Sequence, residues 1–196
     1  GNATAIAGVG RGGIEQLLRR GTGGDPTLLV NRMTAGLGTI ESALPAKRLW
    51  RIGRMVAADP SLGALFDRGL DAVLDALDAA SADDRRLAFA ASFASFLRDH
   101  GHRGPDEYEL AAPSWALEPR IALALIDRLR LAPPERDPDV VAVRLAADRA
   151  AAVSEALELV PRPMRPLVRR ALHVCEVGAS ARERAKDAMV RELGGM

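Results

Sequence analysis

The stretch LAFAASFASFLRDHGHRGPDEYELAAPSW, residues 87–115, contains the two features that decide the fold of this chain. In its first half, Phe89, Phe93 and Phe96 recur at positions i, i+4 and i+7, the spacing that places side chains on one face of a helix. Its second half is polar and is broken by glycine and proline, which favour turns. The stretch therefore predicts a helix that ends in a polar joint.

The helical pattern continues on both sides of this stretch. Apolar residues recur every three or four positions through almost the whole chain, and alternating β-branched runs are absent. The sequence predicts an all-α fold, a single helical domain of about seven to nine helices with an extended joint at 101–117. Helices are expected near residues 23–38, 44–59, 60–67, 69–80, 81–100, 117–131, 138–160 and 167–193.

The amino-terminal stretch GVGRGG formally matches the dinucleotide-binding pattern G-x-G-x-x-G through Gly8, Gly10 and Gly13. That pattern requires a preceding strand and a parallel β-α-β unit, and the sequence predicts neither. We therefore assign residues 1–24 to a flexible leader and expect the helical domain to span residues 25–196.

Composition sets further limits on the class of protein. A chain of 196 residues with 48% hydrophobic content can bury a packed core. Its single cysteine, Cys175, excludes an internal disulfide and multi-cysteine zinc sites, and we expect it to be a small buried residue. No apolar run is long enough to cross a bilayer and no signal-peptide pattern occurs, so we predict a cytoplasmic protein without a membrane partner.

The charged residues argue against a nucleic-acid partner. The 27 basic and 26 acidic residues are interleaved and give a net charge of only +1, so they do not create a field of one sign. The densest basic run places Lys47, Arg51 and Arg54 on one helical stripe that could meet a phosphate. We favour the alternative of a solvated helix face, because a single stripe with one aromatic residue is a weak signal.

Histidines and acids in the joint raise the question of a metal site. His100 and His102, with Glu107 and Glu109, could supply ligands. However, an H-x-H pair at the end of a helix directs its side chains apart, and zinc sites normally show tighter spacing. We therefore predict no metal site. The chain has neither a G-x-S-x-G motif nor a P-loop, and we expect no catalytic residue in it.

The joint itself has the residues of a rigid polar corner. Gly101 fits a left-handed residue at the end of the phenylalanine helix, and Gly104-Pro105 favours a turn. Arg103 has nearby acids with which it could form a planar pair, and Trp115 would anchor the segment on the core.

Three stretches resemble a known family. GHRGPDEYELAAPSW, residues 101–115, resembles the motif before a tryptophan in the central helical domain of the PEP-synthase-like, PEP-utilising phosphotransferases, the group that includes rifampin phosphotransferase. Residues 31–56 are similar to the early helices of that domain, and residues 179–196 to its closing helix.

In that family an ATP-grasp domain phosphorylates a histidine on a swivelling domain, which carries the phosphate to a second substrate. The resemblance implies that this chain is the acceptor-binding domain of such an ATP-dependent phosphotransferase and is part of a larger multidomain protein. The partners implied are an apolar small-molecule acceptor and the ATP-grasp and swivelling domains of the same polypeptide. No cofactor is implied in this chain, whereas ATP and magnesium are implied for the full-length enzyme.

The resemblance, with the apolar character of small-molecule pockets, also implies site residues. The candidates for substrate binding are His102, Arg103, Glu107, Phe89, Phe93, Phe96, Leu37, Trp50 and Met55. The candidates for facing a phosphate are Arg182 and Lys186, and those for the structural joint are Gly101, Pro105, Pro113 and Trp115. The phenylalanines could instead form ordinary core, and Glu183 with Lys186 could form a salt-bridged helix face.

The sequence departs from the rifampin enzymes at His102 and Ser114, so we do not expect rifamycin to be the acceptor. His102 would instead face another acceptor or the incoming phosphohistidine. The alternative function is a stand-alone helical adaptor or assembly module without catalysis, which an exposed apolar patch would favour. A ligand-sensing regulator is a third possibility, but the chain lacks a basic recognition helix near its amino terminus.

Overall fold

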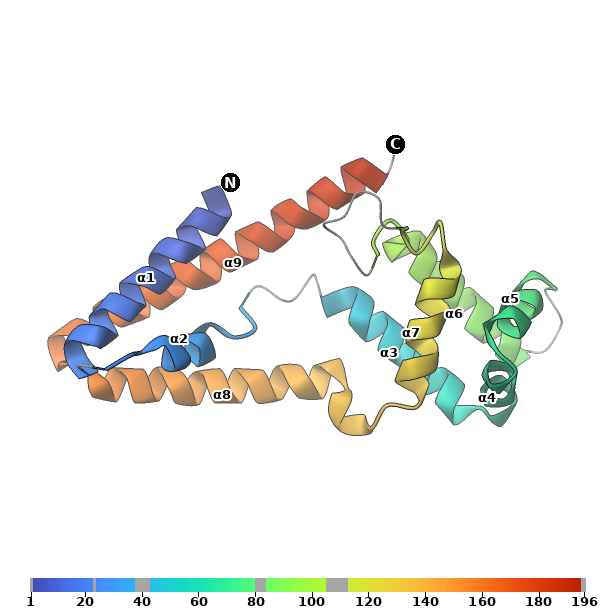
Figure 1. Ribbon diagram of the computed structural model, residues 1–196, viewed down its shortest axis with the longest axis horizontal. Helices are drawn as coiled ribbons and strands as arrows, with labels where there is room; N and C mark the ends of the chain where they lie inside the picture. Colours follow the sequence, from blue (N-terminus) through green and yellow to red (C-terminus); the bar gives the residue numbers. More distant parts are fainter. Residues whose placement is uncertain (1, 23, 38–42, 80–83, 105–112, 195–196) are drawn as a thin grey trace. The chain divides into compact units, whose positions relative to one another are not determined.

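The computed structural model describes residues 2–22, 24–37, 43–79, 84–104 and 113–194 (Figure 1). Over these residues the chain contains nine α-helices, two short 3-10 helices and no strand, which confirms the all-α fold class. The α-helices are α1 (Asn2–Thr22), α2 (Thr27–Thr34), α3 (Ala43–Ala58), α4 (Pro60–Asp67), α5 (Leu70–Asp78), α6 (Asp84–His100), α7 (Pro119–Arg130), α8 (Pro138–Leu159) and α9 (Arg165–Gly194).

The chain divides into two compact units. Unit 1 comprises residues 1–42 and 139–187, and so contains α1, α2 and most of α8 and α9. Unit 2 comprises residues 43–138 and 188–196, and so contains the continuous run from α3 to α7.

Unit 1 has a core of mostly small and aliphatic side chains. Figure 1 shows α1 running beside α9 and α2 lying along α8. These helices bury one apolar stripe each, the pattern expected of amphipathic helices that share a core. The buried residues are Ile14, Leu18, Val30, Met33, Ala152, Ala156, Leu157, Val160, Val168 and Cys175.

The segment that we expected to be a flexible leader is instead helical over Asn2–Thr22, with Ile14 and Leu18 fully buried. Its glycines serve the contact with α9. A Cβ added at Gly10 would lie 2.7 Å from Sγ of Cys175 and 2.9 Å from the carbonyl oxygen of Ala171. Glycine costs helix propensity, but here its missing side chain lets two helix backbones approach closely.

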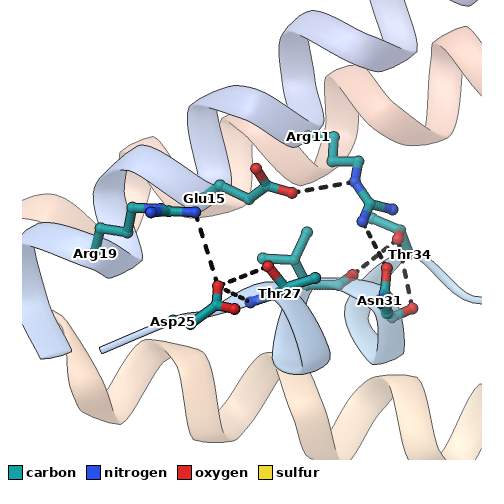
Figure 2. Close-up of polar contacts among 8 residues, drawn as sticks. Arg11, Glu15, Arg19, Asp25, Thr27, Asn31 and Thr34 are labelled. Carbon is teal, nitrogen blue, oxygen red and sulfur yellow. Dashed lines mark hydrogen bonds and ion pairs between the residues drawn. The ribbon is translucent and has the colours of Figure 1, made fainter. Parts of the chain in front are cut away.

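Polar contacts fix α2 between its neighbours. On one side Arg11 and Arg19 of α1 reach toward α2 (Figure 2). On the other side Arg32 donates hydrogen bonds to Asp148 through Nε and Nη2, at 3.1 and 3.0 Å, and its Nη1 lies 2.9 Å from Glu155. These contacts join α2 to both α1 and α8.

Unit 2 is built around an aromatic core. The ring centroids of Phe66 and Phe89 lie 5.7 Å apart in an edge arrangement, and those of Phe89 and Phe93 lie 6.2 Å apart in nearly parallel planes. Phe96 packs on Trp115 at 5.1 Å. Such pairs contribute stability beyond the area that they bury. Aliphatic residues of α3, α4, α5 and α7 complete this core.

The end of α7 is capped by a residue from the basic run. Nη1 of Arg54 lies 3.1 Å from the carbonyl oxygen of Ala132 and 3.4 Å from that of Arg130, and its guanidinium lies 5.6 Å from the ring centre of Trp50. The last carbonyls of a helix lack internal donors, and a cation there is favourable. Arg54 is therefore engaged in helix capping, whereas Arg51 of the same stripe is exposed, as expected for a solvated helix face.

The two described ends of the joint are hydrogen-bonded to each other. The amide of Trp115 donates to the carbonyl oxygen of Arg103 at 2.8 Å, and the amide of Ala116 donates to that of Gly101 at 2.8 Å. The prediction of a left-handed Gly101 is wrong, because the described glycines with positive φ are Gly36 and Gly69. Glycine is needed at 101 for space, since a Cβ would collide with the carbonyl oxygen of Leu97.

Candidate functional site

The joint brings together some of the residues predicted for it. Trp115 is only 6% exposed and anchors the joint on Phe96, as predicted. Arg103 is also buried, and His102 is half-buried beside it. Burial lowers the pKa of the neighbouring His100. Pro105 and Glu107 lie outside the described residues, so the predicted pairing of Arg103 with acids of the joint stays a prediction.

The three phenylalanines of α6 belong to the core. Phe89, Phe93 and Phe96 are between 1% and 4% exposed. Phe89 borders a small cavity of about 10 Å³ with leucine, valine and alanine side chains, which holds a single water at most. The described structure thus favours the core interpretation of these residues over an aromatic wall for a ligand.

Trp50 and Met55, also predicted to contact a substrate, have structural contacts as well. The indole Nε1 of Trp50 donates a hydrogen bond of 2.9 Å to Asp137, which ties α3 to the segment before α8. Met55 packs against the aromatic core. The side chain of Trp50 is 5% exposed, so a ligand would reach little of it.

Among its described residues, unit 1 has two larger cavities. One, of about 340 Å³, is bordered by α2 and α8 and includes Leu28 and Arg32. The other, called the unit 1 cavity below, lies between α1, α9 and the end of α2. Its volume is about 300 Å³, the lower end of the range for small-molecule sites. It brings together Leu37 and Arg182, one predicted as a pocket wall and the other as facing a phosphate. The lining residues are Gly8, Arg11, Thr34, Leu37, Cys175, Ala179 and Arg182.

The polar part of this cavity is organised by Arg11. Its Nε donates to Glu15 at 3.2 Å and its Nη2 donates to Asn31 at 2.6 Å, so the guanidinium is held between α1 and α2 (Figure 2). The hydroxyl of Thr34 donates to the carbonyl oxygen of Val30 at 2.8 Å, and its oxygen can still accept a hydrogen bond.

Cys175 borders the cavity and is 3% exposed, which confirms the prediction of a small buried residue. Burial raises the pKa of its thiol above the ordinary value, so the thiol is neutral at neutral pH. The side chain of Lys186, the second residue predicted to face a phosphate, lies outside the description, as does that of Glu183.

Sequence reasoning missed Arg11, Thr34 and Ala179 as members of one site. Arg11 sits in the stretch assigned to a leader, and the glycines around it suggested a nucleotide motif. A signal was present nonetheless, because Ile14 and Leu18 are spaced as the buried stripe of a helix.

Two further absences hold for the described residues. Among them no group of three or more histidine, cysteine, aspartate or glutamate side chains could hold a metal ion. None of the described helices combines the length and the apolar character needed to cross a bilayer.

Over its described residues the chain is thus an all-helical domain with a cavity of small-molecule size. The sequence matches the family model of the rifampicin phosphotransferase fourth domain over residues 2–183. Since this match covers most of the chain, the chain belongs to the rifampicin phosphotransferase fourth-domain family, which confirms the resemblance seen in its sequence motifs. No curated protein and no solved structure matches the chain.

Proposed function

We propose that this chain is the acceptor-binding domain of an ATP-dependent phosphotransferase and that the cavity of unit 1 holds the acceptor. The observation that carries the proposal is the convergence of two family-like stretches on one cavity. Thr34 and Leu37 come from the early-helix stretch, residues 31–56, and Ala179 and Arg182 come from the closing-helix stretch, residues 179–196.

The lining suggests how an acceptor would be held. Leu37 and Ala179 offer apolar contact, and the hydroxyl of Thr34 and the guanidinium of Arg11 offer hydrogen bonds that fix orientation. Arg182 would neutralise the charge of a phosphoryl group as it passes from the histidine of the swivelling domain to an oxygen of the acceptor. Phosphoryl transfer depends mainly on positioning and charge stabilisation, which is what this set of residues can supply.

In this proposal ATP and magnesium are bound by the ATP-grasp domain, and the swivelling domain carries the phosphohistidine. This chain contributes the acceptor site alone. His102 lies in unit 2, so its proposed role toward the acceptor or the phosphohistidine is a separate hypothesis. That hypothesis fails if His102→Ala in the complete protein leaves phosphotransfer unchanged.

The test uses the complete polypeptide that contains this chain, incubated with labelled ATP and a library of hydroxyl-bearing compounds. We expect Leu37→Glu to reduce phosphorylation of the acceptor by about tenfold or more, because a charge in the wall opposes apolar contact with the acceptor. Labelling of the swivelling histidine by ATP should be unchanged. Leu28→Glu is the matched control, since Leu28 lies on α2, is 74% exposed and borders the other cavity of unit 1.

Equal loss of acceptor phosphorylation in both variants, or no loss in either, would contradict the placement of the acceptor site. A complete polypeptide that is never labelled by ATP would contradict the phosphotransferase function itself.

A second function, that of a helical assembly module, has one observation in its favour. Val140 and Val143 of α8 are 50% and 71% exposed, and such residues can form a docking surface. If assembly is the function, the chain should self-associate in a sedimentation experiment, and Val143→Lys should abolish that association without affecting small-molecule binding.

A further inference from the structure

The lining of the unit 1 cavity combines positive charge with apolar surface. Arg11 borders it from α1 and Arg182 from α9, so two arginines line the same space. The other lining side chains are uncharged, including the thiol of Cys175, whose pKa is raised by burial. The charged residues of the lining are therefore two arginines. Glu15, which is not a lining residue, offsets part of the charge of Arg11, and the remaining guanidinium donors favour an anionic ligand.

Arg11 is positioned before any ligand binds. Its contacts with Glu15 and Asn31 use two of the five N–H donors of the guanidinium and orient its plane (Figure 2). The side chain is 41% exposed, so a ligand can reach it. A fixed fork of donors suits the planar oxygens of a carboxylate, sulfonate or phosphoryl group.

We propose that this cavity binds an amphipathic small molecule whose oxyanion lies between Arg11 and Arg182 and whose apolar body packs against Leu37 and Ala179. The inference rests on the proposed function only in taking this ligand to be the acceptor. The class of ligand can be tested on the 196-residue chain without phosphotransfer.

The test compares two fluorescent probes that share one ring skeleton. 8-Anilinonaphthalene-1-sulfonate carries an oxyanion, and N-phenyl-1-naphthylamine lacks it. We expect the chain to bind the sulfonate roughly tenfold more tightly than the neutral probe, because hydrogen bonds between charged groups are stronger than those between neutral groups.

Variants then assign this preference to the two arginines. Arg11→Gln and Arg182→Gln should each reduce the ratio of the two affinities several-fold. Arg20→Gln and Arg184→Gln remove the same charge from the same two helices, outside the cavity, and should leave the ratio unchanged. Circular dichroism establishes that each variant is folded.

A second variant keeps both arginines in place. Ala179→Glu would introduce a carboxylate into the lining one turn before Arg182, and should abolish the preference for the sulfonate. Competition by inorganic phosphate distinguishes the two sources of the anion. Displacement of the sulfonate by phosphate shows that the site also accepts a phosphoryl group, and its absence assigns the site to an oxyanion of the acceptor alone.

Equal affinities for the two probes in the unmodified chain would overturn the inference. So would an equal reduction of the ratio in the cavity variants and in the control variants. The proposed function would survive this failure of the probe experiment if the complete polypeptide still phosphorylates an acceptor and Leu37→Glu reduces that phosphorylation. A clear preference for the sulfonate, with no phosphotransfer by the complete polypeptide, would support the inferred class of ligand and contradict the proposed function.

Discussion

The two units of this chain pack their helices with different kinds of side chain. Unit 2 fills its interior with large aromatic rings and leaves beside Phe89 a cavity of only about 10 Å³. Unit 1 brings helices together through small residues such as Gly10, Ala152 and Ala156, and it has a cavity of about 300 Å³ that two arginines border. The aromatic cluster is thus the more conspicuous feature of the sequence, whereas among the described residues a cavity of small-molecule size lies in unit 1.

The largest change in the free energy of unfolding is expected from a substitution in the aromatic core of unit 2. Phe96 is 1% exposed and packs on Trp115, so Phe96→Ala should leave a cavity and lower the free energy of unfolding by about 3–5 kcal/mol. Urea denaturation followed by circular dichroism measures this change. Leu117→Ala, at a site 82% exposed, should change stability by less than about 0.5 kcal/mol. A small effect of Phe96→Ala would mean that the ring is accessible and could serve a ligand after all.

An intermediate effect is expected where α1 meets α9. Gly10→Ala would place a Cβ against Cys175 and the backbone of Ala171, and should lower the free energy of unfolding by about 1–3 kcal/mol. Gly12→Ala on the same helix meets nothing within 4 Å and should raise stability by up to about 1 kcal/mol. Thermal denaturation of the two variants compares them directly. Similar changes in both would contradict the close approach of these helices.

A smaller effect is expected at Trp50, which was predicted to contact a substrate. Trp50→Phe keeps an aromatic ring and removes the hydrogen bond to Asp137, so the free energy of unfolding should fall by about 1 kcal/mol. Binding of the sulfonate probe should be unchanged. Weakened binding of the probe with unchanged stability would instead indicate that the ligand site lies in unit 2.

The smallest change is expected in the pH dependence of stability, through His100. Burial lowers the pKa of His100 below its ordinary value of 6.5, so the unfolded chain binds a proton more readily than the folded chain. The stability that the neutral imidazole contributes is therefore complete above pH 6.5 and is lost as the pH falls below that value. His100→Gln should flatten this acid limb in denaturation experiments between pH 7.5 and 5.5. An acid limb that is unchanged in this variant would contradict the effect of burial on His100.

The sequence allowed the helices to be predicted because helical periodicity is a local property. The short helix at Pro60–Asp67 coincides with its expected span, since Asp59 caps it and Pro60 suits its first turn. Periodicity also separated the buried face of α6 from its exposed face. It does not say whether a buried face meets a ligand or another helix, and for this reason the phenylalanines were assigned both roles.

The cavity could be predicted only in part, because its walls come from opposite ends of the chain. Leu37 and Arg182 were singled out separately, from different stretches of the sequence, and only the fold shows that they border one space. Arg11 was missed because the glycines beside it suggested flexibility. Their function depends on Ala171 and Cys175 of α9, a contact that no local pattern reveals.

We expect small molecules to bind in unit 1 and not among the phenylalanines of unit 2. The most direct test is a titration of the isotope-labelled 196-residue chain with 8-anilinonaphthalene-1-sulfonate, followed by amide chemical shifts. We expect the largest shifts at Arg11, Leu37 and Ala179. Shifts concentrated at Phe89 and Phe93 instead, with the amides around the unit 1 cavity unmoved, would contradict it.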